Sequence, residues 1–165
     1  MSKVIIDYIN EGEERVVLPV AGGEELVYIL VGLEPGEKEV AVELNGKGAR
    51  ADILGVFVRG EGEAKLRTVQ HHKAATTTSE LLVKSVLNGP AKFDYTGMIQ
   101  IDKQAQNSNA YQKNDNLVLD EQAKVDTRPE LEILANEVKC SHGATIGQID
   151  QKQVFYLMSS CLLYT

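Results

Sequence analysis

The sequence predicts an all-β fold, and within that class a β-helix, in which short strands coil into stacked turns. Short runs of alternating apolar and polar residues are punctuated by Gly, Asn, Asp and Pro, which is the pattern of β-strands. A unit that starts with a small apolar residue also repeats along the chain. Its spacings are 15 residues (49 to 64), 14 (91 to 105), 18 (105 to 123) and 15 (123 to 138). Such spacings predict a stacked repeat.

The same short strands could instead form a sandwich or a barrel. Tight hairpins in such folds favour Asn-Gly or Asp-Gly turns, and only residues 45–46 and 88–89 have this sequence. Small residues that recur at one point of each unit fit corners that stack on neighbouring turns. The pattern therefore favours the β-helix.

The predicted elements follow in chain order. Strands at 16–19, 26–31 and 40–44 open the stack. The repeated units lie at 48–52, 63–67, 90–94, 122–126 and 137–141, and residues 104–107 begin in the same way but lose the second apolar position. A second set of strands is expected at 81–86, 98–101, 117–119 and 131–134.

The last residues have a different period. Asp150 is a candidate N-cap for a helix. Apolar residues then follow at helical spacing: Val154, Leu157, Met158, Cys161 and Leu162. The prediction is therefore a β-helix core over residues 1–148 and a short C-terminal capping helix over 149–165, which together make one domain.

Composition excludes several classes of function. Seventeen basic residues stand against 24 acidic ones, giving a net charge of −7, and no Lys/Arg block could neutralise a run of phosphates. No long apolar run or secretory signal appears, so no membrane span is expected. Two cysteines are too few for a disulfide framework, which favours the reducing cytoplasm. The absence of Trp disfavours a carbohydrate-active β-helix enzyme, which would need aromatic residues in a groove.

Cys140 and His142 are the main candidates for chemistry. They lie two residues apart in what reads as a tight polar bend. If the segment is extended instead, both side chains point to one face and could share a metal ion or activate the thiol. The alternative is structural: Cys140 would be a small buried residue of the repeat, and His142 would cap the bend. No paired zinc-ligand spacing accompanies the two residues.

The His71-His72 pair is a weaker candidate. Adjacent residues of a strand face opposite sides, so only one of them, such as His72, could serve an interior site. A solvated pair before a hydroxyl-rich turn at 76–79 is the plainer interpretation. Hydrolase and phosphate-loop signatures are missing, so the chain is not expected to be an enzyme.

From about residue 72 to residue 157 the sequence resembles the core domain of the SufB/SufD scaffold proteins of iron–sulfur cluster assembly. The resemblance rests on many short matches in one order, which include Cys140-Ser141-His142-Gly143. The matching segments are 72, 77–79, 84–87, 97–99, 105–106, 110–114, 116–119, 129–133, 138–145, 147–148 and 155–157. The SufB-like branch has a glutamate after this histidine and a cysteine in the segment matching 114–117. This chain has Gly143 and no such cysteine, so it looks like SufD.

The resemblance implies a right-handed parallel β-helix that dimerises through its core, as a homodimer or with a SufB-like partner. It implies that His142, with Cys140 as a neighbouring thiol, lies near an interface where a nascent iron–sulfur cluster is built. The cluster would be transient and shared with the partner, with none held by the isolated chain. A SufC-like ABC ATPase is a further implied partner. It is in doubt, because residues 159–162 lack the basic residue and the glycine that lead into the family's C-terminal helix.

Two functions from different classes therefore remain. The first is a non-enzymatic scaffold that presents His142 at a cluster-assembly interface. The second is a structural β-helix module that dimerises but binds no cluster. The second is favoured if Cys140 and His142 both point into the core and are satisfied there.

Overall fold

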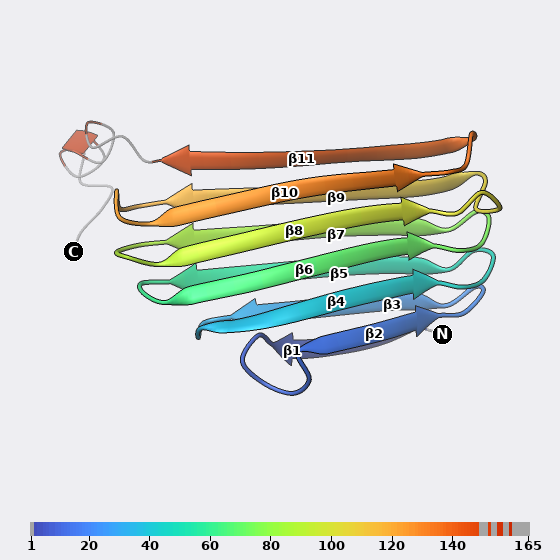
Figure 1. The fold of residues 1–165 in the computed structure, drawn as a ribbon, viewed down its shortest axis with the longest axis horizontal. Helices are drawn as coiled ribbons and strands as arrows, with labels where there is room; N and C mark the ends of the chain where they lie inside the picture. The colour runs from blue at the N-terminus through green and yellow to red at the C-terminus, as the bar shows by residue number, and fades with distance from the viewer. Residues whose placement is uncertain (1, 149–151, 153–154, 157–158, 160–165) are drawn as a thin grey trace.

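The computed structural model describes residues 2–148 together with 152, 155, 156 and 159. Two parallel sheets face each other, and the chain alternates between them at every strand (Figure 1). Sheet A consists of β1 (Ser2–Tyr8), β3 (Glu25–Gly32), β5 (Arg50–Arg59), β7 (Thr78–Leu87), β9 (Ser108–Val118) and β11 (Val138–Gln148). Sheet B consists of β2 (Arg15–Val20), β4 (Gly36–Leu44), β6 (Glu63–His72), β8 (Lys92–Ile101) and β10 (Lys124–Ile133). This is a β-solenoid, as predicted.

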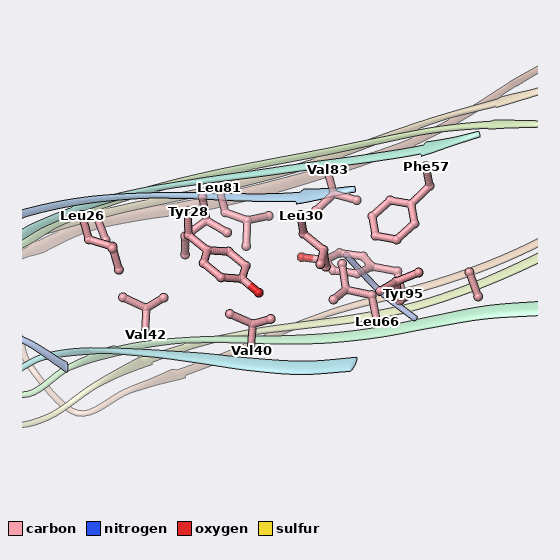
Figure 2. Packing of buried hydrophobic residues seen from close by; sticks show 14 of the residues in the cluster. Leu26, Tyr28, Leu30, Val40, Val42, Phe57, Leu66, Leu81, Val83 and Tyr95 are labelled. Carbon is pink, nitrogen blue, oxygen red and sulfur yellow. The ribbon is translucent and has the colours of Figure 1, made fainter. Parts of the chain in front are cut away.

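The core fills the space between the two sheets. Alternate residues of each strand point inward, since successive side chains of a strand face opposite sides. Tyr28 and Phe57 from sheet A meet aliphatic residues and Tyr95 from sheet B (Figure 2). The rings of Phe57 and Phe93 have centroids 4.7 Å apart, so aromatic packing links the two sheets.

The corners carry the small residues that the repeat predicted. Ala49, Ala64, Ala91 and Ala105 are each at most 1% exposed. One backbone conformation also recurs before the strands of sheet A. Residues with positive φ lie one or two positions ahead of β3, β5, β7 and β9, namely Gly23, Gly48, Thr76 and Asn107. The turns are therefore equivalent in backbone even where their sequences differ.

Several boundaries differ from the prediction. On β8 and β10, a repeated unit and a strand of the second set turn out to be two halves of one ten-residue strand: residues 92–94 and 98–101, for example, both lie on β8. The first strand, β1, was not predicted. The predicted C-terminal helix over 149–165 rests on residues that lie outside the described ones, namely Asp150, Val154, Leu157, Met158, Cys161 and Leu162. Within the described residues, no helix has the length and hydropathy needed to cross a bilayer.

Candidate functional site

The candidate site lies on β11, which pairs with β9 and, among the residues that the structure describes, with no other strand. Cys140 stands opposite Ala110, and His142 stands opposite Gln112. Both β9 residues are only 1% exposed and face the interior of the coil, so Cys140 and His142 occupy interior-facing positions. Two steps along a strand separate their Cα atoms by about 7 Å. The structure thus places the two candidates on one face.

The predicted polar bend at this segment is wrong. Residues 138–148 form one continuous strand in register with β9, because the backbone of β9 offers eleven consecutive pairing partners. His142 therefore does not cap a bend. The extended alternative, which predicted a shared face, is the one that the structure adopts.

Cys140 is half-buried at the edge of the second apolar cluster of the core. Its neighbours there include Ile99, Ala110 and Ala135. Burial in these apolar surroundings raises the pKa of the Cys140 thiol. Because only the thiolate is a strong metal ligand, this environment favours a packing role over a ligand role.

His142 has a different environment, although it faces the same way. Its side chain is exposed, because no strand of the described residues stacks beyond β11 in sheet A. It makes no hydrogen bond or ion pair with any residue that the structure describes. The imidazole is therefore available to an incoming group at this end of the coil.

Buried amides form the layer beneath His142. Gln112 donates from Nε2 to the carbonyl of Gly97 at 3.3 Å, and Asn116 donates from Nδ2 to Asn114 Oδ1 at 2.6 Å. Gly97 provides the room for this arrangement, since a Cβ there would lie 2.3 Å from Gln112 Nε2. This amide layer was not predicted from the sequence. The period-2 run of amides at 112, 114 and 116 was the signal that could have revealed it.

Apolar side chains of the last turn surround the site. Leu131 and Ile133 of β10 stand in register with the fully buried Ile99 and Ile101, so they face inward. They are nevertheless 42% and 39% exposed, and Ile146 of β11 is 56% exposed. Core-type residues are thus uncovered on the same last turn of the coil as His142, which is typical of an interaction surface.

His72 does not join this site. Its side chain is fully buried, with Nδ1 2.7 Å from Thr77 Oγ1 and Nε2 2.8 Å from Ser79 Oγ. Ala110 lies between Ser79 and Cys140 in the sheet register, so His72 is enclosed beneath the last turn. Burial, with a smaller contribution from the neighbouring His71, lowers the pKa of His72 to about 4.

The interpretation of the two histidines as a solvated pair is wrong for His72. His71 faces outward, and its Nε2 atom lies 3.0 Å from Asp102 Oδ1. Their opposite orientations match the alternation expected of a strand. Within the described residues, no three His, Cys, Asp or Glu side chains are grouped so that they could hold a metal ion.

Comparison with known proteins identifies the family. Residues 12–163 match the family described as "SUF system FeS cluster assembly, SufBD core domain". The chain belongs to the SufBD family. The match confirms the resemblance seen in the sequence and includes all of β11 with its Cys140 and His142 positions.

Several curated SufBD proteins are similar to the chain. The iron–sulfur cluster assembly protein SufD of Escherichia coli (strain K12) is 36% identical over 121 residues, which cover 72% of this chain and 28% of that protein. A SufBD family protein of Mycobacterium leprae (strain TN) is 33% identical over 130 residues, covering 78% of this chain and 15% of that protein. A SufBD family protein of Synechocystis sp. (strain PCC 6803) is 46% identical over 78 residues, covering 47% of this chain and 17% of that protein. The chain thus spans under a third of each relative.

Proposed function

We propose that this chain is a SufD-like, non-enzymatic scaffold component of iron–sulfur cluster assembly in the cytoplasm. The observation that carries the proposal is the position of His142: it faces inward on the last described strand, yet it is exposed and forms no hydrogen bond or ion pair with a described residue. A neutral imidazole nitrogen is a good ligand for iron. The cluster would be cargo, held transiently between His142 and ligands of a partner.

The proposed partner surface is the free edge of β11 together with the uncovered last turn. A strand at the edge of a sheet leaves every second backbone N–H and C=O without a partner in the sheet, which favours pairing with another strand. Leu131, Ile133 and Ile146 add apolar area beside that edge. Both features support dimerisation, with a second copy or with a SufB-like chain. The resemblance also predicts a SufC-like ATPase as a further partner.

One observation favours the competing function, a structural module that dimerises without a cluster. Cys140 packs against the core, and burial raises the pKa of its thiol. Cys140 alone is therefore a poor ligand in the unpartnered chain. The scaffold proposal consequently assigns the ligand role to His142 and a packing role to Cys140.

Anaerobic reconstitution with iron and sulfide separates the two functions. The chain would be reconstituted alone and mixed with a SufB-like partner, and bound iron and sulfide would be measured after gel filtration. The scaffold proposal predicts cluster retention only in the mixture, and a loss of retention in His142→Ala. His71→Ala is the matched control, since it removes a histidine from the outer face of sheet B. Equal retention by wild type and His142→Ala would favour the structural module.

A further inference from the structure

Two of the chain's prolines lie within strands, and both lie at the ends of sheet B. The chain has four prolines. Pro19 lies on β2 and Pro129 on β10, the outermost strands of sheet B in the part of the chain that the structure describes. Pro35 and Pro90 lie in the corners that precede β4 and β8. The corresponding strands of sheet A, β1 and β11, contain no proline, so each of their residues has a backbone N–H group.

The backbone of Pro129 faces away from the rest of sheet B. Lys124, at the start of β10, donates its N–H to the carbonyl of Ala91 at 2.9 Å. Leu134, just after the end of β10, donates to the carbonyl of Ile101 at 2.9 Å. Alternate residues of a strand direct their N–H and C=O groups to opposite sides, so the even-numbered residues of β10 face β8. Pro129 is odd-numbered and therefore faces the outer edge.

Pro19 has the same orientation at the other end of the sheet. Glu39 of β4 donates to the carbonyl of Glu14, just before β2, at 2.6 Å. Asn45, just after β4, donates to the carbonyl of Val20 at 2.9 Å. The even-numbered residues of β2 therefore face β4, and Pro19 faces the outer edge. Each end of sheet B thus has a proline where a further strand would need an N–H donor.

A proline in this orientation opposes the addition of a strand in two ways. It has no N–H group to donate to a carbonyl of the added strand, and its ring fills the space that this carbonyl would occupy. Proline on an edge strand is one of the features by which natural proteins avoid pairing with other chains. Pro19 and Pro129 therefore close two edges that would otherwise accept another strand.

The side chains at the two ends of the coil favour stacking. At the last described turn, Leu131 and Ile133 are 42% and 39% exposed although they face the interior. At the first turn, Ile5 and Leu18 are only partly buried. Because the turns share one two-sheet cross-section, the last turn of one copy could stack on the first turn of the next. A contact between two different surfaces of one chain does not close on itself and produces filaments.

We propose that Pro19 and Pro129 prevent copies of this chain from stacking end to end, so that the coil does not grow into a filament. In such a stack β10 of one copy would lie beside β2 of the next, and both prolines would face the same junction. Either proline alone interrupts the pairing of strands there. This role concerns the edges of sheet B and is independent of cluster assembly.

Substitution by valine tests the proposal, because valine restores the N–H group and favours strands. Sedimentation velocity and electron microscopy would compare the wild type, Pro19→Val, Pro129→Val and the double variant at equal concentrations. The double variant should form filaments. The wild type and both single variants should not, because every junction between identical single variants keeps one proline. Pro35→Val combined with Pro90→Val is the matched control, since these prolines lie in corners and their loss should not cause filaments.

A mixture of the two single variants tests the direction of stacking. The last turn of Pro129→Val can join the first turn of Pro19→Val through a junction without proline. The ends of that product still carry Pro19 and Pro129, so assembly should stop after one junction. Fluorescence energy transfer between the two labelled variants should therefore exceed the transfer between labelled samples of either variant alone, without filaments.

Circular dichroism would verify that each variant keeps its fold. A double variant that keeps the wild-type mass would overturn the proposal, and so would filaments of a single variant or of the corner control. Equal energy transfer in the mixture and in the single-variant samples would also overturn it. These measurements use neither iron nor a SufB-like partner, so their failure is distinct from a failure of the cluster-assembly proposal.

Discussion

The Nζ atom of the buried Lys38 lies 2.9 Å from both carboxylate oxygens of Asp7. The same ammonium group donates to the carbonyls of Tyr8 at 2.8 Å and Glu11 at 2.7 Å, so it ties the loop after β1 to β4. Burial alone would raise the pKa of Asp7, but hydrogen bonds from Tyr28 and Lys38 outweigh it and lower the pKa. The pair thus fastens the first turn of the coil.

Lys38→Met is expected to lower the free energy of unfolding by about 3 kcal/mol, because it leaves the part-buried Asp7 without its cation. Urea denaturation measures the change. Arg15→Ala breaks the exposed pair of Arg15 with Glu39 and should cost under about 1 kcal/mol. Equal effects of the two substitutions would contradict the role assigned to Lys38.

His72 predicts a pH dependence of stability. Its pKa is about 4 in the folded chain against an ordinary value of 6.5, so the unfolded chain binds more protons between these values. Stability is therefore complete above about pH 6.5 and falls as the pH drops toward 4, by about 3 kcal/mol in total. Urea unfolding at several pH values measures the slope. His72→Gln should flatten it in this window, and an unchanged slope would show that another group is responsible.

Thr76→Asn should stabilise the chain by about 1 kcal/mol. Thr76 has a φ of 56°, which is strained for a β-branched residue, and Asn107 adopts the same conformation one turn later with a φ of 59°. The substitution copies the sequence of the next turn. Asn107→Thr is the reciprocal control and should destabilise by a similar amount. If thermal denaturation shows the melting temperatures of both variants shifted in the same direction, backbone strain is excluded as the cause.

Gly32 lies directly against the ring of Phe57. A Cβ at Gly32 would be 2.1 Å from Phe57 Cδ1, so Gly32→Ala should cost about 2 kcal/mol through overpacking. Gly60→Ala, where a Cβ meets nothing within 4 Å, is the control. Phe57→Leu should relieve the clash, so the double variant should be more stable than the sum of the single effects implies. Additive effects in urea denaturation would contradict the contact.

Cys140 and His142 should differ in their effects on stability. His142→Ala removes an exposed side chain and should cost under about 1 kcal/mol. Cys140→Ala deletes a sulfur packed against the apolar cluster and should cost on the order of 1 kcal/mol. Denaturant unfolding of both variants measures the contrast. If Cys140→Ala leaves the free energy of unfolding unchanged and His142→Ala unfolds the chain, the packing role and the ligand role are assigned to the wrong residues.

The repeat could be predicted because its signal is local. Small residues such as Ala64 and Ala91 must be buried wherever the chain turns a corner, so they recur at a readable spacing. The full length of the strands could not be predicted in the same way. Gly97 interrupts the alternation of apolar residues within β8, so the two halves of this strand are predicted as separate strands. It is a glycine because Gln112, from the opposite sheet, occupies the space of its missing side chain. That contact belongs to the fold and not to the local sequence.

The site was predictable in part for the same reason. Alternation showed that His71 and His72 must face opposite ways, but not which of them faces inward. The answer depends on Thr77 and Ser79, which reach His72 only because the chain turns a corner between β6 and β7. The polar residues around Cys140 suggested a bend, whereas pairing with β9 holds the segment straight.

The one-sided pairing of β11 has a consequence for amide hydrogen exchange. In a strand with a single neighbour, alternate N–H groups point toward that neighbour and the others point away from it. Amides of β11 should therefore exchange in an every-other-residue pattern, while those of β9, held between β7 and β11, should be protected without interruption. A partner chain that pairs with the free edge of β11 as the next strand would protect all amides of β11, so the alternation would disappear. A partner that only covers the exposed apolar residues of the last turn would leave the alternation unchanged.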